Sequence, residues 1–156
     1  MISMIRSSMQ MKRMIYFVII TLTFFSCTAS FLKDEITINE LIIEKEKIDH
    51  TENPAEVLLL KNSLSEKILY LDEILVKDIV NSTNVDYDFC VIAEVPTEKG
   101  IIECSIYTKN IKRISQLKKG KSIISVKGEF KRYYSMLDNF YTKVEITNSN
   151  IIIKTK

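Results

Sequence analysis

The stretch YDFCVIAEVPTEKGIIECSIY, residues 87–107, predicts a β-hairpin around which the rest of the fold is built. Apolar side chains occupy alternate positions of both arms, which places them on one buried face of a sheet. These positions are Phe89, Val91, Ala93, Val95, Ile102, Cys104 and Ile106. Residues 97–100, TEKG, supply the turn, because Gly100 adopts positive φ at little steric cost. Pairing Pro96 with Ile101 brings both apolar sets to the same side, and we expect this register.

Two elements are expected before the hairpin. Pro54–Lys61 predicts a short helix, since Asn53 is a suitable N-cap and proline is favoured at the first helical position. Leu58, Leu59 and Leu60 give this helix a broad apolar face, which we expect to pack on the domain. Glu66–Val80 has both helix-like and strand-like spacings, and we favour one long bent strand because β-branched residues are frequent in its second half.

Two further elements are expected directly after the hairpin. Apolar residues at a spacing of three in Asn110–Lys119, followed by Gly120 as a C-cap, predict one or two helical turns. Ser122–Phe130 alternates in the manner of a strand. Gly128 inside that strand indicates a bend or a close backbone contact, as at the corner of a barrel.

The chain then has an expected loop at Arg132–Asn139 and a final strand, or pair of short strands, at Tyr141–Lys154. The order of elements and the run LKKGKSIISVKGEF, residues 117–130, resemble the tRNA-anticodon-like family of OB-fold proteins. The resemblance covers residues 54–153. It implies a mainly β, five-stranded Greek-key barrel, with an N-terminal helix and a short helix between strands three and four. One departure is that the first strand has no glycine at its bend.

The first 27 residues have the pattern of an export signal. Lys12 and Arg13 precede an uncharged run, residues 14–25, and Cys27 follows Ser26. This arrangement resembles a bacterial, spirochaete-like lipoprotein signal. The resemblance implies that Cys27 carries an acyl chain such as palmitate and becomes the mature N-terminus. Translation starts at Met1 or at Met11.

Two alternatives to a lipoprotein signal stay open. The uncharged stretch continues to Leu32, which makes 19 residues from Met14 and is long enough for an uncleaved transmembrane anchor. Cleavage as an ordinary signal peptide is the other alternative, and Phe25 departs from the small residue usual two places before a lipidated cysteine. All three place the body outside the cytoplasm, and a lipoprotein favours the outer membrane or the cell surface.

Residues 28–53 are acidic and polar, and we expect a tether between the signal, residues 1–27, and a domain at residues 54–156. His50, the single histidine, lies in this tether with no cysteine near it. Metal sites need several such ligands close together, so we expect no metal and no other cofactor.

Charge is divided unevenly along the chain. Residues 28–107 have 7 basic and 17 acidic side chains (net −10), and residues 108–156 have 12 and 3 (net +9). The two halves either neutralise each other once folded or leave the second half for an anionic partner. Basic and aromatic side chains on the outer face of the expected barrel are candidates for ligand binding. They are Tyr107, Lys109, Lys127, Lys131 and Tyr133. Acids on the same face, such as Glu94 and Glu103, make it a face of mixed charge.

The sequence has no serine–histidine–aspartate arrangement, no paired-acid motif and no phosphate-binding glycine loop, so we expect no enzyme. Cys90 and Cys104 invite a disulfide in an exported protein. The hairpin register places them on opposite faces and about three residues, or roughly 10 Å, apart along the strands, which is too far. We therefore expect two free thiols, with that of Cys104 in the core.

These features predict a lipid-anchored envelope or surface lipoprotein that acts as a non-catalytic binding module for a protein or glycan. The alternative is an OB-fold protein that binds single-stranded nucleic acid or another polyanion, motivated by the basic second half. A structural envelope protein without a discrete ligand is a third possibility.

Overall fold

A computed structural model describes residues 33–98, 100–136 and 141–154 of the chain. The chain divides into two units, Met1–Lys33 and Asp34–Lys156, and the second holds the secondary structure discussed below. The expected signal segment and its Cys27 lie outside the described residues.

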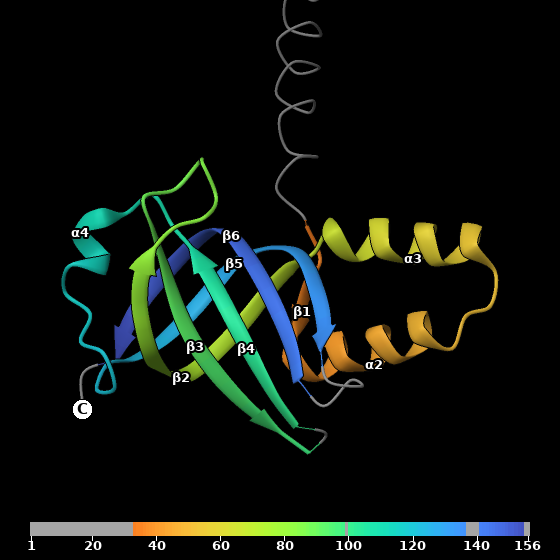
Figure 1. The fold of residues 1–156 in the computed structure, drawn as a ribbon, viewed down its shortest axis with the longest axis horizontal. Helices are drawn as coiled ribbons and strands as arrows, with labels where there is room; N and C mark the ends of the chain where they lie inside the picture. Colours follow the sequence, from red (N-terminus) through yellow and green to blue (C-terminus); the bar gives the residue numbers. More distant parts are fainter. Residues whose placement is uncertain (1–32, 99, 137–140, 155–156) are drawn as a thin grey trace, which may run out of the picture. The chain divides into compact units, whose positions relative to one another are not determined.

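Five strands close into a barrel (Figure 1). They are β2 (Ile68–Asn81), β3 (Phe89–Thr97), β4 (Gly100–Tyr107), β5 (Ile123–Met136) and β6 (Tyr141–Lys154). Neighbours follow the order β2-β3-β4-β6-β5, and β5 pairs with β2 to complete the ring. The pairing of β4 with β6 is parallel, and the other pairings within the ring are antiparallel. A mainly β fold with a closed five-stranded barrel is thus confirmed.

The hairpin of β3 and β4 has the register that the sequence predicts. Pro96 pairs with Ile101 and Ala93 with Cys104. Ala93 and Cys104 are fully buried, as expected for the inner face. Gly100 has φ 129°, so the turn uses the positive φ that glycine allows.

The segment that we expected as one long bent strand is β2. Its first half pairs with β5 and its second half with β3, so the strand must bend to join the two ends of the sheet. The register shifts between Leu71 and Ile74, and Glu73 within this bulge has φ 51°. Positive φ costs a non-glycine residue roughly 1–2 kcal/mol. The bend of this strand, for which the sequence has no glycine, is therefore made at the exposed Glu73.

Gly128 in β5 marks a close backbone contact, as predicted. The register shifts between Lys127 and Glu129, and a Cβ at Gly128 would lie 2.5 Å from Ser149 Oγ and 2.9 Å from the backbone oxygen of Thr147. Only a residue without a side chain fits between these strands.

The prediction of a loop at Arg132–Asn139 is wrong for its first part. β5 continues to Met136, because β6 supplies partners along its length, such as Val144 opposite Tyr133. Residues 137–139 lie outside the described part. A second shift of register, between Phe130 and Arg132, leaves Lys131 as the extra residue of a bulge.

The part of the expected tether that the structure describes, from residue 34 on, is folded instead. β1 (Glu35–Thr37) pairs in parallel with the start of β2, and α2 (Ile38–Asp49) follows it. Thr37 and Glu40 form a capping box at the start of α2. The compact unit therefore begins at Asp34 rather than at residue 54. Buried positions recur at helical spacing, and they are Leu41, Lys45 and Ile48.

Helix α3 (Pro54–Ser65) begins where the sequence predicts, with the Asn53 side chain accepting a hydrogen bond from the Ala55 amide. It lies beside α2, and the two helices project from one side of the barrel (Figure 1). The expectation that all three leucines pack on the domain is wrong. Leu58 and Leu59 are 60% and 69% exposed, because the buried face of the helix is centred on Leu64.

A single helical turn, α4 (Ile111–Ile114), connects β4 to β5. Ile114 and Leu117 are buried, whereas Ile111 is exposed. Gly120 ends this connection with φ 67°, in the left-handed region expected for a C-cap glycine.

Candidate ligand-binding site

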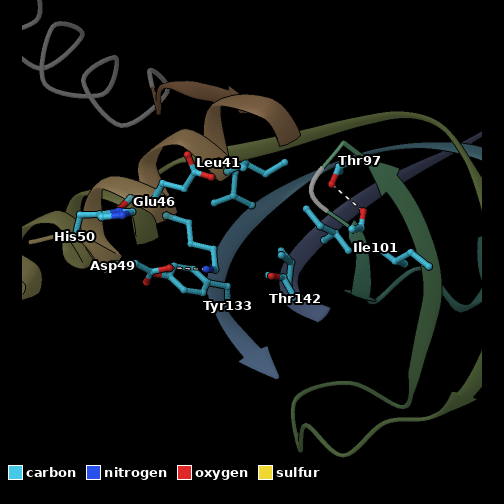
Figure 2. A pocket seen from close by; sticks show the side chains of 13 residues that line it. Leu41, Glu46, Asp49, His50, Thr97, Ile101, Tyr133 and Thr142 are labelled. Atoms are coloured by element: carbon cyan, nitrogen blue, oxygen red, sulfur yellow. Dashed lines mark hydrogen bonds and ion pairs between the residues drawn. The ribbon is translucent and has the colours of Figure 1, made fainter. Parts of the chain in front are cut away.

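A cavity of about 390 Å³ lies between α2 and one end of the barrel (Figure 2). Its barrel side is formed by the turn of the β3–β4 hairpin, the late part of β5 and the start of β6. Leu41, Ile102 and Val144 make part of an apolar wall, and Thr97, Thr142 and Tyr133 add hydroxyl groups. The volume is in the range of small-molecule sites, which are mostly apolar with a few polar groups that fix orientation.

The polar side chains of α2 reach this cavity because they are spaced by one helical turn. Lys45 is only 8% exposed, and its Nζ lies 2.5 Å from Asp49 Oδ2, four residues further on. The same Nζ is 5.6 Å from the centre of the Tyr133 ring, within reach of a cation–π contact. The cation therefore has neighbours on both its own helix and β5.

The Tyr133 hydroxyl is buried and has no hydrogen-bond partner within residues 33–98, 100–136 and 141–154. Burial raises the pKa of this phenol to about 12, and the negative charge of Asp49 adds to the effect. A buried polar group without a partner costs roughly 1–3 kcal/mol. The phenol is thus protonated at neutral pH, and it belongs to a side chain that lines the cavity.

His50 adds an acceptor at the rim. Its Nδ1 is 2.7 Å from the backbone oxygen of Glu46. A carbonyl oxygen only accepts, so Nδ1 carries a proton, and in the neutral form of the ring Nε2 is the acceptor. Glu46 and Asp49 also line the cavity, which therefore has two carboxylates to one lysine. This balance favours neutral, hydrogen-bonding ligands over anions.

The five candidate residues from the sequence are not brought together. Tyr107 is buried, and its ring is 5.4 Å from that of Tyr87, while Lys109 lies 5.9 Å above the Tyr87 ring. Tyr107 ends β4, whereas the cavity lies at the opposite end of the same strand, at Gly100 and Ile101. Tyr107 and Lys109 thus belong to a different part of the barrel.

The three remaining candidates also separate. Lys127 pairs with Glu35 of β1, away from any shared site. Tyr133 lines the cavity, and with Lys131 it also lines a smaller hollow between α3 and β5. Of the five predicted positions, only Tyr133 contributes to the cavity.

Charged side chains on the outer face of the barrel are joined in ion pairs across the strands. The pairs are Lys77–Glu94, Lys143–Glu103 at 3.1 Å and Arg132–Glu145 at 2.7 Å. Exposed pairs of this kind contribute little to stability, but they fix the charge pattern of the surface. The face has mixed sign, as the acids in the sequence indicate, rather than a continuous basic track.

Both cysteines of the barrel are buried free thiols. Burial raises the pKa of Cys104 to about 12 and also raises that of Cys90. Thiolates are the reactive form of cysteine, so these two side chains are poor nucleophiles and poor metal ligands at neutral pH.

Helix α2, which forms one side of the cavity, was not predicted, although the sequence holds a signal for it. Thr37 and Glu40 have the spacing of a capping box, and apolar residues follow at helical intervals. The acidic and polar composition of the segment favoured the prediction of a tether instead.

In the described part of the chain, no group of three or more histidine, cysteine, aspartate or glutamate side chains is placed to hold a metal ion. Among the helices of residues 33–98, 100–136 and 141–154, none has the length and apolar character needed to cross a membrane. The sequence matches no protein-family model and no curated protein.

Proposed function

We propose that this protein is an exported lipoprotein, anchored through an acylated Cys27, whose barrel is a non-catalytic binding module for a protein or glycan. The outer membrane or the cell surface is its expected location. The observation that carries the binding role is the cavity between α2 and the barrel, lined by Tyr133, whose buried hydroxyl has no partner among the described residues. A site that already has a shape and an unsatisfied donor is arranged for a ligand with a hydrogen-bond acceptor.

The order of the strands supports an OB-like Greek-key barrel as the scaffold. β4 and β6 are neighbours in parallel, β2 pairs with both β3 and β5, and α4 lies between β4 and β5 in the chain. In the proposed OB-like barrel, β2–β6 are strands one to five, and α4 is the helix between strands three and four. The tRNA-anticodon-like family remains the relative suggested by the sequence, and we infer no action on tRNA from it.

The chemistry of the cavity supports a glycan unit or a short peptide segment. Both present carbonyl or hydroxyl acceptors for Tyr133 and donors for the carboxylates of Glu46 and Asp49. Methyl groups or the apolar face of a sugar ring suit the wall of Leu41, Ile102 and Val144. The ion-paired outer face gives less support to binding of nucleic acid, which needs an excess of positive charge.

Two substitutions at Thr142, which is half-buried and lines the cavity, test the binding role (Figure 2). Thr142→Trp fills the cavity, whereas Thr142→Val keeps its volume and serves as the matched control. Each variant is immobilised and exposed to glycans and peptides released from cell envelopes, and the retained material is identified by mass spectrometry. We expect retention by the wild type and Thr142→Val and its loss in Thr142→Trp. Equal retention by both variants would exclude the cavity as the site.

The anchor is tested by fatty-acid labelling and intact mass of the expressed protein, compared with Cys27→Ala. We expect an acyl mass that the substitution removes. An unacylated wild type would leave a membrane-spanning or simply secreted protein.

A further inference from the structure

Helix α3 exposes apolar side chains that the barrel does not cover. Leu58 and Leu59 are 60% and 69% exposed, and Leu64 is the one residue of the helix that is buried. Beside this helix lies the hollow between α3 and β5, with a volume of about 220 Å³ and a floor that includes Leu64 and Phe130. Exposed apolar side chains next to an apolar hollow are typical of an interaction surface.

Two lysines stand at this hollow. Lys61 comes from α3, and Lys131 is the extra residue of the β5 bulge, which turns its side chain out of the alternation of the strand. Neither lysine has an ion-pair partner within the described ranges of the chain, whereas Arg132 beside them pairs with Glu145. The hollow thus combines an apolar floor with two cations.

The helical repeat joins these features into one surface. Residues three apart are neighbours on a helix, so Leu58 lies beside Lys61 on the side that leads to the hollow. Leu59 follows about 100° further around the helix, across the outward face. Glu56, the one acid of α3, lies on the far edge of this face by the same count.

We propose that Leu58, Leu59, Lys61 and Lys131, here called the α3 surface, dock on the lipid bilayer that holds the anchor. The proposal rests on the proposed function, because the anchor brings the surface to the membrane. Cys27 and Asp34 are seven residues apart, a span of at most about 25 Å. The anchored domain therefore stays beside the bilayer.

The chemistry of the α3 surface matches that of a membrane interface. Leucines on one face of a helix enter the boundary between headgroups and acyl chains, and adjacent lysines attract anionic headgroups. Docking would orient the barrel on the membrane instead of leaving its orientation about the anchor undefined.

The absence of tryptophan from the chain gives a clean probe of docking. Leu59→Trp introduces a single emitter on the α3 surface, and Ile152→Trp introduces one at a 54% exposed position of β6 as the control. The full chain is reconstituted in vesicles of phosphatidylcholine and phosphatidylglycerol in equal parts, with brominated acyl chains as quenchers. We expect a blue shift and strong quenching for Leu59→Trp and neither for Ile152→Trp.

Charge reversal tests the part played by the lysines. In the Leu59→Trp protein, Lys61→Glu with Lys131→Glu should weaken quenching on the mixed vesicles, by at least about fivefold per lysine in the docking equilibrium, because each substitution removes one positive charge and adds a negative one. Vesicles of phosphatidylcholine alone should show a much smaller effect. Reversal of Lys112, exposed on α4, is the matched control and should leave quenching unchanged.

Intact mass separates failure of the anchor from failure of docking. Quenching of Leu59→Trp in protein without an acyl mass would uphold docking and remove the anchor. No quenching in acylated, vesicle-bound protein would overturn docking and leave the anchor in place. Absence of both would overturn both. A blue shift without vesicles that grows with protein concentration would assign the α3 surface to a second copy of the chain and overturn docking on lipid.

Discussion

The barrel and helix α3 differ in how much apolar surface they bury. Leu69, Ile106 and Ile146 in the barrel have no exposed area, whereas α3 buries one residue and leaves Leu58 and Leu59 open. Burial of apolar surface is the main source of stability in folded proteins. The difference therefore indicates that the barrel supplies most of the stability of the fold, while α3 leaves apolar surface uncovered.

The largest test of this contrast compares a core residue with an exposed one of similar size. Ile146→Ala should lower the free energy of unfolding by about 4 kcal/mol, because it leaves a cavity at a fully buried position. Leu59→Ala should change it by less than about 0.5 kcal/mol. Urea unfolding followed by circular dichroism measures both. A loss above 2 kcal/mol in Leu59→Ala would mean that α3 is part of the stabilising core.

The next largest effect on stability is expected at Gly128 in β5, and Gly120, in the connection before β5, is its comparison. Gly128→Ala should cost about 3 kcal/mol, since its Cβ would meet backbone and side chains of β6 at under 3 Å. Gly120→Ala has open space around the new Cβ and should cost only about 1 kcal/mol, for its positive φ. Similar losses of stability in the two variants, measured by thermal unfolding, would show that β5 and β6 can move apart at Gly128.

The cap of α2 should have a smaller and local effect. Thr37→Ala removes the hydroxyl that accepts from the Glu40 amide, at a cost of about 1 kcal/mol. Hydrogen exchange should quicken in α2 and stay unchanged in β4 and β6. Faster exchange throughout the barrel would show that the helices and barrel unfold as one unit.

The same cap has a pH dependence whose sign follows from Glu40. Hydrogen bonds from Thr37 hold the pKa of Glu40 below its usual 4.5. Its contribution is therefore present above pH 4.5 and is lost as the pH falls through the lowered pKa. The protection factors of the α2 amides, which correct for the slower intrinsic exchange in acid, should fall over that range in the wild type but not in Glu40→Gln.

Local patterns in the sequence were enough for the hairpin and for the close contact at Gly128, and insufficient for the site. Alternation predicted the hairpin register, and the glycine itself marked the close contact, because both depend on near neighbours. The cavity depends on α2 meeting residues far along the chain, such as Tyr133 and Thr142. Neither the periodicity nor the charge pattern of the sequence specifies that tertiary contact. Tyr133 was selected for an outer face, yet it lines the cavity, because the bulge at Lys131 resets the alternation of β5.

The smallest effect, and the one most specific to the site, is expected at Tyr133. Tyr133→Phe removes a buried hydroxyl that has no partner in the part of the chain that the structure describes, so the free energy of unfolding should stay the same or rise by up to about 1 kcal/mol. Tyr134→Phe is the control, because its exposed hydroxyl donates to Glu145 Oε1 at 3.1 Å. It should change stability by less than about 0.5 kcal/mol in either direction. Both are measured by urea unfolding.

Titration of the tyrosines tests the same side chain independently. Tyr133 and Tyr107 both have a pKa of about 12, so both should stay protonated after ordinary tyrosines have ionised near pH 10. Burial disfavours ionisation of both phenols in the folded state, so the stability they allow is fully present below pH 10 and is lost as the pH rises towards 12. Tyr133→Phe should remove one of the late steps in ultraviolet absorbance, whereas Tyr134→Phe should leave both. Loss of ligand retention together with that step, and without loss of stability, would tie the unsatisfied hydroxyl to binding rather than to folding.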